Sequence, residues 1–140
     1  MPFGGFDHVD VRVRKLADVE AFYDALLPAI GLPEKRYANV DRTGEWSAGD
    51  AARHNASEYY EARAAGRARF FIGIIEDRRP PSATRIAFRV PRRRFEALER
   101  LLRACGARDV ERSADMDAYP AIFFADPAGT RLEFVARKAR

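Results

Sequence analysis

A single cysteine, Cys105, is present among the 140 residues, so the chain can form no internal disulfide. One unpaired cysteine agrees with a reducing compartment. The sequence also lacks any run of 18 or more apolar residues, which excludes a membrane-spanning helix of ordinary length. Its first residues lack the charged-then-apolar layout of a signal peptide. These absences predict a cytoplasmic protein with no membrane partner.

Lysine is scarce as well, because arginine supplies 22 of the 25 basic residues. With 21 acidic residues, the formal net charge is +4, a balance that favours an anionic partner. The arginines are scattered among acids, and their densest run covers only residues 92–94. We therefore expect a solvated basic surface and no binding to nucleic acid. Hydrophobic residues make up 47%, enough for the core of one domain.

An internal repeat is the most informative feature of the sequence. Residues 6–14 and 84–90 both alternate between polar and apolar side chains, which is typical of half-buried strands. The apolar faces consist of Val9, Val11 and Val13, and of Ile86, Phe88 and Val90. The opposite faces carry His8, Asp10 and Arg12, and Arg85, Ala87 and Arg89.

A helical pattern follows each of these strands. The first begins after Asp18, a good N-cap residue, and Gly31 ends it. Pro91 opens the second pattern and Gly106 closes it. The two strand–helix units are therefore near copies of each other.

Three more strands are predicted in each half, at residues 35–40, 45–48, 69–75, 108–112, 121–125 and 131–136. Residues 50–66 lack a counterpart, and their Ala, Glu, Tyr and Arg content predicts a short helix over 56–65. The sequence thus predicts a single α+β domain of two βαβββ modules, residues 1–77 and 84–140. A Pro- and Arg-rich linker at 78–83 joins them.

This layout resembles the vicinal oxygen chelate superfamily, which includes glyoxalases, bleomycin resistance proteins and extradiol dioxygenases. The matching segments are Phe-Asp-His-Val at 6–9, Ala-Phe-Tyr at 21–23, Ile-Ala-Phe at 86–88 and Phe-Ala-Asp-Pro-Ala-Gly-Thr-Arg-Leu-Glu-Phe-Val at 124–135. The resemblance implies that the modules form a cupped mixed sheet, a half-barrel with its helices on the outer face. It also implies a small-molecule pocket in the cup.

The resemblance implies an incomplete metal site. Four cup positions, on the first and last strand of each module, hold a divalent Fe, Mn, Ni, Zn or Co ion in metal-dependent members. They fall here on His8, Gly73, Arg85 and Glu133. Glycine offers no donor atom, and arginine stays protonated and cannot bind a cation. His8 and Glu133 alone make a poor metal site.

Arg85 offers a replacement for the metal, because a guanidinium brings a fixed positive charge to the cup. It would pair with Glu133, or bind a carboxylate or enolate oxygen of a ligand. A different register leaves a metal site open. In that case His54 completes a 2-His-1-carboxylate set with His8 and Glu133, or Glu76 supplies the third ligand.

Three classes of function follow from this sequence. The first is a binding protein for a small organic, anionic ligand, without a complete metal site. The second is a lyase, isomerase or dioxygenase, either dependent on a metal or metal-free with Arg85 stabilising an oxyanion and His8 moving the proton. The third is an interaction protein, and a homodimer is expected. Catalytic roles are predicted for His8, Glu133 and Arg85, and ligand binding for Asp10, Arg12, Trp46, Gly73, Arg89 and Tyr119.

Overall fold

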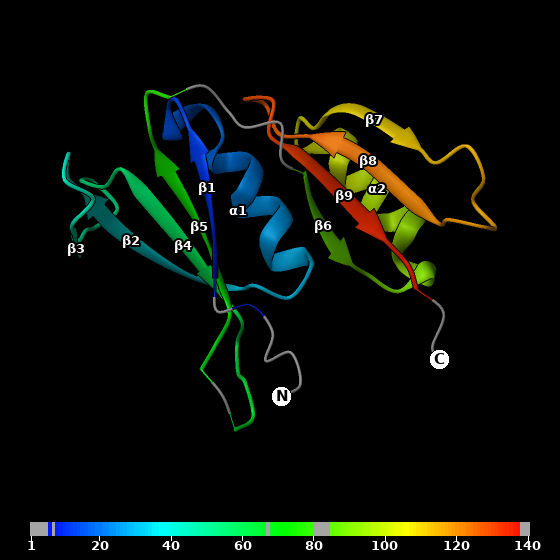
Figure 1. The fold of residues 1–140 in the computed structure, drawn as a ribbon, viewed down its shortest axis with the longest axis horizontal. Helices are drawn as coiled ribbons and strands as arrows, with labels where there is room; N and C mark the ends of the chain where they lie inside the picture. Colours follow the sequence, from blue (N-terminus) through cyan, green and yellow to red (C-terminus); the bar gives the residue numbers. More distant parts are fainter. Residues whose placement is uncertain (1–5, 7, 67, 80–84, 138–140) are drawn as a thin grey trace.

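The computed structural model describes residues 6, 8–66, 68–79 and 85–137. Its elements form two modules that lie side by side (Figure 1). Module one contains β1 (His8–Val13), the 3-10 turn η1 (Leu16–Asp18), α1 (Glu20–Ala29), β2 (Glu34–Val40), β3 (Trp46–Ala48), β4 (Ala56–Tyr60) and β5 (Phe71–Glu76). Module two contains β6 (Arg85–Arg89), the 3-10 turn η2 (Arg92–Arg94), α2 (Phe95–Ala104), β7 (Arg108–Arg112), β8 (Ala121–Ala125) and β9 (Arg131–Val135).

Each module forms its own mixed sheet, and the two sheets share one plan. The strand order is β1-β5-β4-β2-β3 in module one and β6-β9-β8-β7 in module two. In both, the first and last strands pair in parallel and the other neighbours pair antiparallel. The predicted α+β fold of two βαβββ modules is confirmed. The predicted linker at 78–83 lies partly outside the described residues.

Strand β4 corrects the helix predicted over residues 56–65. Ala56–Tyr60 lies between β2 and β5 and pairs with both. Ser57 and Tyr59 bond to side chains of α1, whereas Glu58 lines a pocket on the other side of the sheet. This alternation has the period of a strand. Pairing on both edges outweighs the helical preference of the local composition.

The helix ends agree with the sequence in part. Gly31 at φ +105° and Gly106 at φ +88° follow α1 and α2, as predicted for left-handed terminal residues. Asp18, however, is not the N-cap of α1, because the chain enters this helix through η1 and Val19 precedes it without a side-chain cap. The predicted strand at 45–48 is β3, but it is an extra strand at the sheet edge, beside β2.

The main core is a cluster of buried residues that draws on both modules, and Ala38, Ala56 and Ile75 form a second, smaller cluster in module one. Helix α1 covers one face of the module-one sheet and also lies at the junction with module two (Figure 1). There the hydroxyl of Tyr23 donates a 2.7 Å hydrogen bond to Asp126, in the turn between β8 and β9. One face of each sheet is left without a helix, and we call these the open faces. No helix in the described part of the chain is long and apolar enough to cross a membrane.

Candidate functional site

The open face of module one carries a polar row that crosses four strands. The register places Asp10 of β1 beside Gly73 of β5, and Gly73 beside Glu58 of β4. Glu58 in turn pairs with Arg36 of β2. Because paired residues project to the same side of a sheet, these side chains share the open face. They line a pocket of about 550 Å³, which we call the His8 pocket after another of its lining residues.

Asp10 leans across the gap left by Gly73. A Cβ atom at position 73 would lie 2.7 Å from Asp10 Oδ1, so this position requires glycine for the observed carboxylate geometry. Asp10 Oδ2 lies 3.8 Å from Nε2 of His8. Oδ1 is buried and accepts no hydrogen bond from any described residue. A buried oxygen without a donor is costly, so the close approach of Oδ1 to Gly73 leaves Oδ2 as the oxygen of this 26% exposed side chain that a ligand can reach.

Aromatic rings form one side of the His8 pocket. The ring of His8 stacks on Phe71 with 4.8 Å between centroids, and Phe71 stacks on Tyr60 at 4.7 Å. The guanidinium of Arg36 lies 4.6 Å from the centroid of the Tyr60 ring. Trp46 of β3 also lines the pocket and is 41% exposed. An exposed indole above a polar floor suits a ligand with a flat apolar part.

The open face of module two carries Glu133, which is only 5% exposed. The hydroxyl of Tyr119 donates a 2.5 Å hydrogen bond to its carboxylate. This bond raises the pKa of Tyr119, and burial and the negative charge of Glu133 act in the same direction. The tyrosine therefore stays protonated and holds the carboxylate in place. No other hydrogen bond to this carboxylate is formed within the described residues.

Arg85 lies on the same open face, with its guanidinium carbon 4.7 Å from the centroid of the Phe123 ring. Its side chain is exposed, and among the described residues it forms no ion pair, with Glu133 or with any other acid. The predicted pair of Arg85 with Glu133 is therefore not formed. The stacking on Phe123 holds the guanidinium, and Tyr119 holds the carboxylate. Arg85 remains open to an oxyanion of a ligand.

The register also relates the two open faces to each other. Gly73 in β5 and Glu133 in β9 both pair with the third residue of the parallel first strand. His8 and Arg85 are the first residues of β1 and β6. The four positions that the family resemblance singled out are therefore two structurally equivalent pairs.

One chain does not bring these pairs together. The His8 pocket is lined by residues of module one alone, and the described partner of Glu133 belongs to module two. Helix α1 lies between the sheets (Figure 1), so the predicted meeting of these side chains in one cup does not occur within a single chain. Arg12 lies farther along the first open face, bonded to Asp77 at 3.2 Å. Arg89 lies exposed on β6.

The donor atoms do not fit a divalent cation within one chain. The described residues contain no group of three or more His, Cys, Asp or Glu side chains suited to a metal. His54 bonds through Nε2 to Glu20 of α1 at 2.7 Å. Glu76 accepts a hydrogen bond from the backbone amide of Leu16 at 2.9 Å. Neither of the proposed third ligands lines the His8 pocket.

Glu20 provides a test of the pH dependence of this network. Burial opposes its ionisation, but hydrogen bonds from His54 and Ser57 outweigh burial and lower its pKa below the ordinary 4.5. A lowered pKa stabilises the fold above that ordinary value, and the contribution disappears as the pH falls below it. We expect Glu20→Gln to cost about 1 kcal/mol at pH 7 and progressively less in acid, measured by urea unfolding. The exposed Glu96→Gln is the control, and an equal cost at pH 7 and in acid would contradict this role.

Two residues of the His8 pocket, Glu58 and Arg36, were not predicted from the sequence. Glu58 falls in the segment assigned to a helix, and the alternation over Ala56–Tyr60 was the signal that could have placed it on a strand face. Arg36 lies on the predicted strand, but its neighbours become clear only from the register of β2 with β4.

Comparisons with known proteins identify the fold. The sequence matches no protein-family model and no curated protein. An integron cassette protein from the mobile metagenome of Halifax Harbour sewage outfall is 23% identical, with a TM-score of 0.60 over 96% of this chain and 100% of its own. A glyoxalase/bleomycin resistance protein from Albidiferax ferrireducens is 20% identical, with a TM-score of 0.62 over 95% and 98%.

A third similar structure is a mutant of the fosfomycin resistance protein FosX from Listeria monocytogenes, complexed with Mn(II) and 1S,2S-dihydroxypropylphosphonic acid. It is 19% identical, with a TM-score of 0.57 over 98% of this chain and 95% of its own. The comparisons confirm that the chain has the fold of the vicinal oxygen chelate superfamily.

Proposed function

We propose that this protein binds a small organic anion on its open sheet faces, without a complete metal site. The observation that carries the proposal is the position of Arg85. This arginine is the first residue of β6, as His8 is of β1, and it has no acidic partner among the described residues. Its planar guanidinium group would bind an oxyanion of the ligand. Asp10 Oδ2 would accept a hydrogen bond from a ligand hydroxyl, and Trp46 would cover an apolar part. A single cysteine favours the cytoplasm as its compartment.

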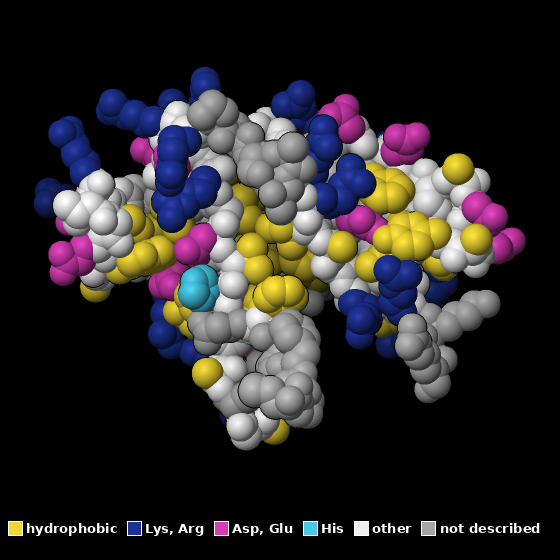
Figure 2. All heavy atoms as spheres, in the orientation of Figure 1, with side chains coloured by type: hydrophobic (Ala, Val, Ile, Leu, Met, Phe, Trp, Pro, Cys, Tyr) yellow, Lys and Arg dark blue, Asp and Glu magenta, His cyan; other side chains and the backbone are white. Residues whose placement is uncertain are grey.

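The complete site would form in a homodimer, in which module one of each copy faces module two of the other. Each open face of one chain carries half of the predicted set, His8 with Asp10 on one and Arg85 with Glu133 on the other. Figure 2 shows hydrophobic side chains in the hollow between the two modules, a surface that a second copy would cover. A two-fold axis would create two equal sites from these halves.

Mixing of variants tests the shared site. Hydroxyl-bearing carboxylates and phosphonates, including 1,2-dihydroxypropylphosphonate, would be screened by thermal shift and titrated by calorimetry. We expect His8→Ala and Arg85→Gln each to lose binding of the best anion. Their co-refolded mixture should regain about one quarter of the sites, because half of the dimers are mixed and each mixed dimer has one intact site. No recovery in a mixture shown by light scattering to be dimeric would contradict the shared site.

Gly73 provides a milder test of the pocket. In Gly73→Ala the new Cβ displaces the Asp10 carboxylate, since the two atoms would lie 2.7 Å apart. We expect the free energy of unfolding to change by less than about 1 kcal/mol, because alanine suits a strand better than glycine does. Anion affinity should fall about tenfold, the effect of one misdirected hydrogen bond to a charged group. Calorimetry on Gly31→Ala, at a turn outside the pocket, is the control for binding, and unchanged affinity in Gly73→Ala would remove Asp10 from the site.

A metal-dependent lyase, isomerase or dioxygenase is the second candidate. The observation that favours it is the Asp10 carboxylate, whose Oδ2 lies 3.8 Å from Nε2 of His8. In the proposed dimer, Glu133 of a second copy would add a third donor to these two. Mn(II), which accompanies FosX in the similar structure, is the first ion to test.

A further inference from the structure

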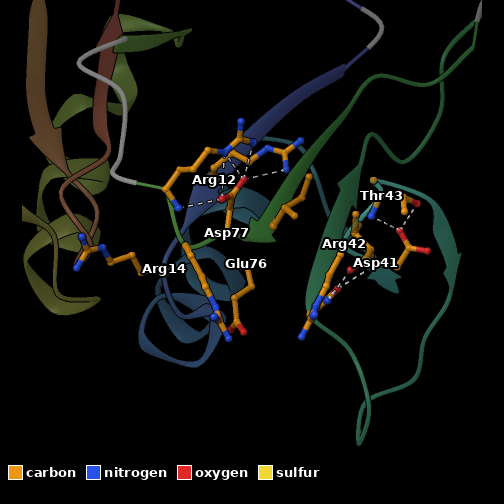
Figure 3. A pocket seen from close by; sticks show the side chains of 13 residues that line it. Arg12, Arg14, Asp41, Arg42, Thr43, Glu76 and Asp77 are labelled. Carbon is orange, nitrogen blue, oxygen red and sulfur yellow. Dashed lines mark hydrogen bonds and ion pairs between the residues drawn. The ribbon is translucent and has the colours of Figure 1, made fainter.

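A second hollow, larger than the His8 pocket, lies at the far ends of β1, β2 and β5. Its volume is about 890 Å³, and the turn between β2 and β3 forms one wall (Figure 3). Five arginines line it, against three acids: Arg12, Arg14, Arg42, Arg78 and Arg79, with Asp41, Glu76 and Asp77. Figure 2 shows a dense group of basic side chains over this end of module one. We call this hollow the arginine pocket.

The acids of the arginine pocket are engaged in local bonds. Oδ2 of Asp77 accepts hydrogen bonds from Nε and Nη2 of Arg79, at 3.1 and 2.7 Å. It also accepts a 3.2 Å hydrogen bond from Arg12. The bond from Arg79 holds the pKa of Asp77 well below its usual range. Glu76 caps the amide of Leu16 at 2.9 Å. Asp77 therefore stays charged, and both carboxylates are bound to neighbours within the fold.

The third acid, Asp41, is used by its own turn. Its Oδ1 accepts hydrogen bonds from the amide and the hydroxyl of Thr43, at 2.8 and 2.7 Å. Arg14, Arg42 and Arg78 form no hydrogen bond or ion pair with any residue that the structure describes. Three guanidinium groups are thus left without an anionic partner around one hollow.

Unpaired arginines in a concave site attract anions more strongly than the same charges spread over a convex surface. The planar fork of each guanidinium matches the oxygens of a phosphate group. The walls also include apolar atoms of Val40 and Ile75, which offer contact to an organic body. The size of the hollow suits a small molecule, since a nucleic-acid strand needs an extended groove.

We propose that the arginine pocket is a second binding site, separate from the His8 pocket, for a small organic phosphate. Arg42 and Arg78, in the β2–β3 turn and in the segment after β5, hold the phosphate, and Val40 with Ile75 contact the organic group. Asp77 keeps Arg12 and Arg79 in place beside them.

Calorimetry at fixed ionic strength tests the assignment with phenyl phosphate and inorganic phosphate as probes. We expect both to bind, with phenyl phosphate several times tighter because of Val40 and Ile75. Arg42→Gln and Arg78→Gln should each weaken binding about tenfold or more. Both side chains lack described partners, so melting temperatures should stay close to that of the unchanged protein. Arg100→Gln on α2, an exposed arginine far along the sequence, is the matched control.

Three results would overturn the proposal. Equal weakening by Arg100→Gln would mean that the probes respond only to diffuse charge. Equal affinity for the two probes would remove the organic group from the assignment. Displacement of phenyl phosphate by a short DNA duplex at lower concentration would indicate a surface for extended polyanions. Binding of phenyl phosphate should persist in His8→Ala, so failure of one site does not decide the other.

Discussion

Replacing Asp126 with alanine is expected to lower the free energy of unfolding by roughly 3–5 kcal/mol. The side chain of Asp126 is fully buried in the turn between β8 and β9. It accepts hydrogen bonds from the hydroxyl of Tyr23 at 2.7 Å and from the backbone amides of Ala128 and Thr130 at 2.8 and 2.9 Å. Burial, followed by the charge of Asp126, raises the pKa of Tyr23, so the hydroxyl remains a donor. The variant leaves three donors without their acceptor, two of them buried.

Urea unfolding followed by circular dichroism measures this effect. Tyr23→Phe is the matched variant, because it removes one donor and leaves Asp126 with its two amides, and it should cost about 1–2 kcal/mol. The double variant should cost less than the sum of the two single ones, since the residues share one bond. A loss below about 1 kcal/mol in Asp126→Ala would show that the junction between the modules does not depend on this carboxylate.

Glu133→Leu should raise the free energy of unfolding while it weakens binding of the organic anion. Glu133 is nearly buried, and Tyr119 provides its one described hydrogen bond. Replacing a buried carboxylate with an apolar side chain of similar size often stabilises a protein, here by about 1–2 kcal/mol. Binding of the hydroxyl-bearing organic anion found by the screen should fall about thirtyfold, or about 2 kcal/mol, because a ligand hydroxyl loses the carboxylate that accepts its hydrogen bond. Melting temperature and calorimetry on one preparation give both quantities.

Glu111→Leu is the control for this variant, because Glu111 lies in the same row across the sheet but is exposed. It removes the same charge and should change neither binding nor stability much. A clear loss of stability in Glu133→Leu, with binding unchanged, would make Glu133 a structural residue and leave the pocket without its carboxylate.

The internal repeat explains how much of the fold could be predicted from the sequence. Alternating segments followed by glycine-terminated helices specify two equal modules, and the positions of Gly73 and Glu133 relative to the first strands are confirmed as equivalent. The segment at 56–65 was misassigned because its composition favours a helix, while its period and its two neighbours make Ala56–Tyr60 a central strand. Composition alone carries no information on such pairing.

The site was harder to predict than the fold, for two physical reasons. The Asp10 carboxylate occupies the space that a side chain at position 73 would fill. Which residue lies beside Gly73 follows only from the register of β1 with β5. The distance of His8 from Glu133 depends on how the modules pack, and Tyr23 with Asp126 sets that packing across 103 residues of sequence. Local patterns identified the residues of each open face but could not show that the two faces lie apart in one chain.

The melting temperature of chelator-treated protein, with and without Mn(II), Fe(II), Co(II), Ni(II) and Zn(II), tests the central claim most directly. An ion at one hundred times its dissociation constant stabilises a site by about 2.7 kcal/mol, which is roughly 5–15 °C for a domain of this size. We expect no such shift with any of these ions, because Arg85 stands where a metal ligand would be needed. A shift of that size that disappears in His8→Ala would contradict the metal-free pocket and establish the metal-dependent enzyme in its place.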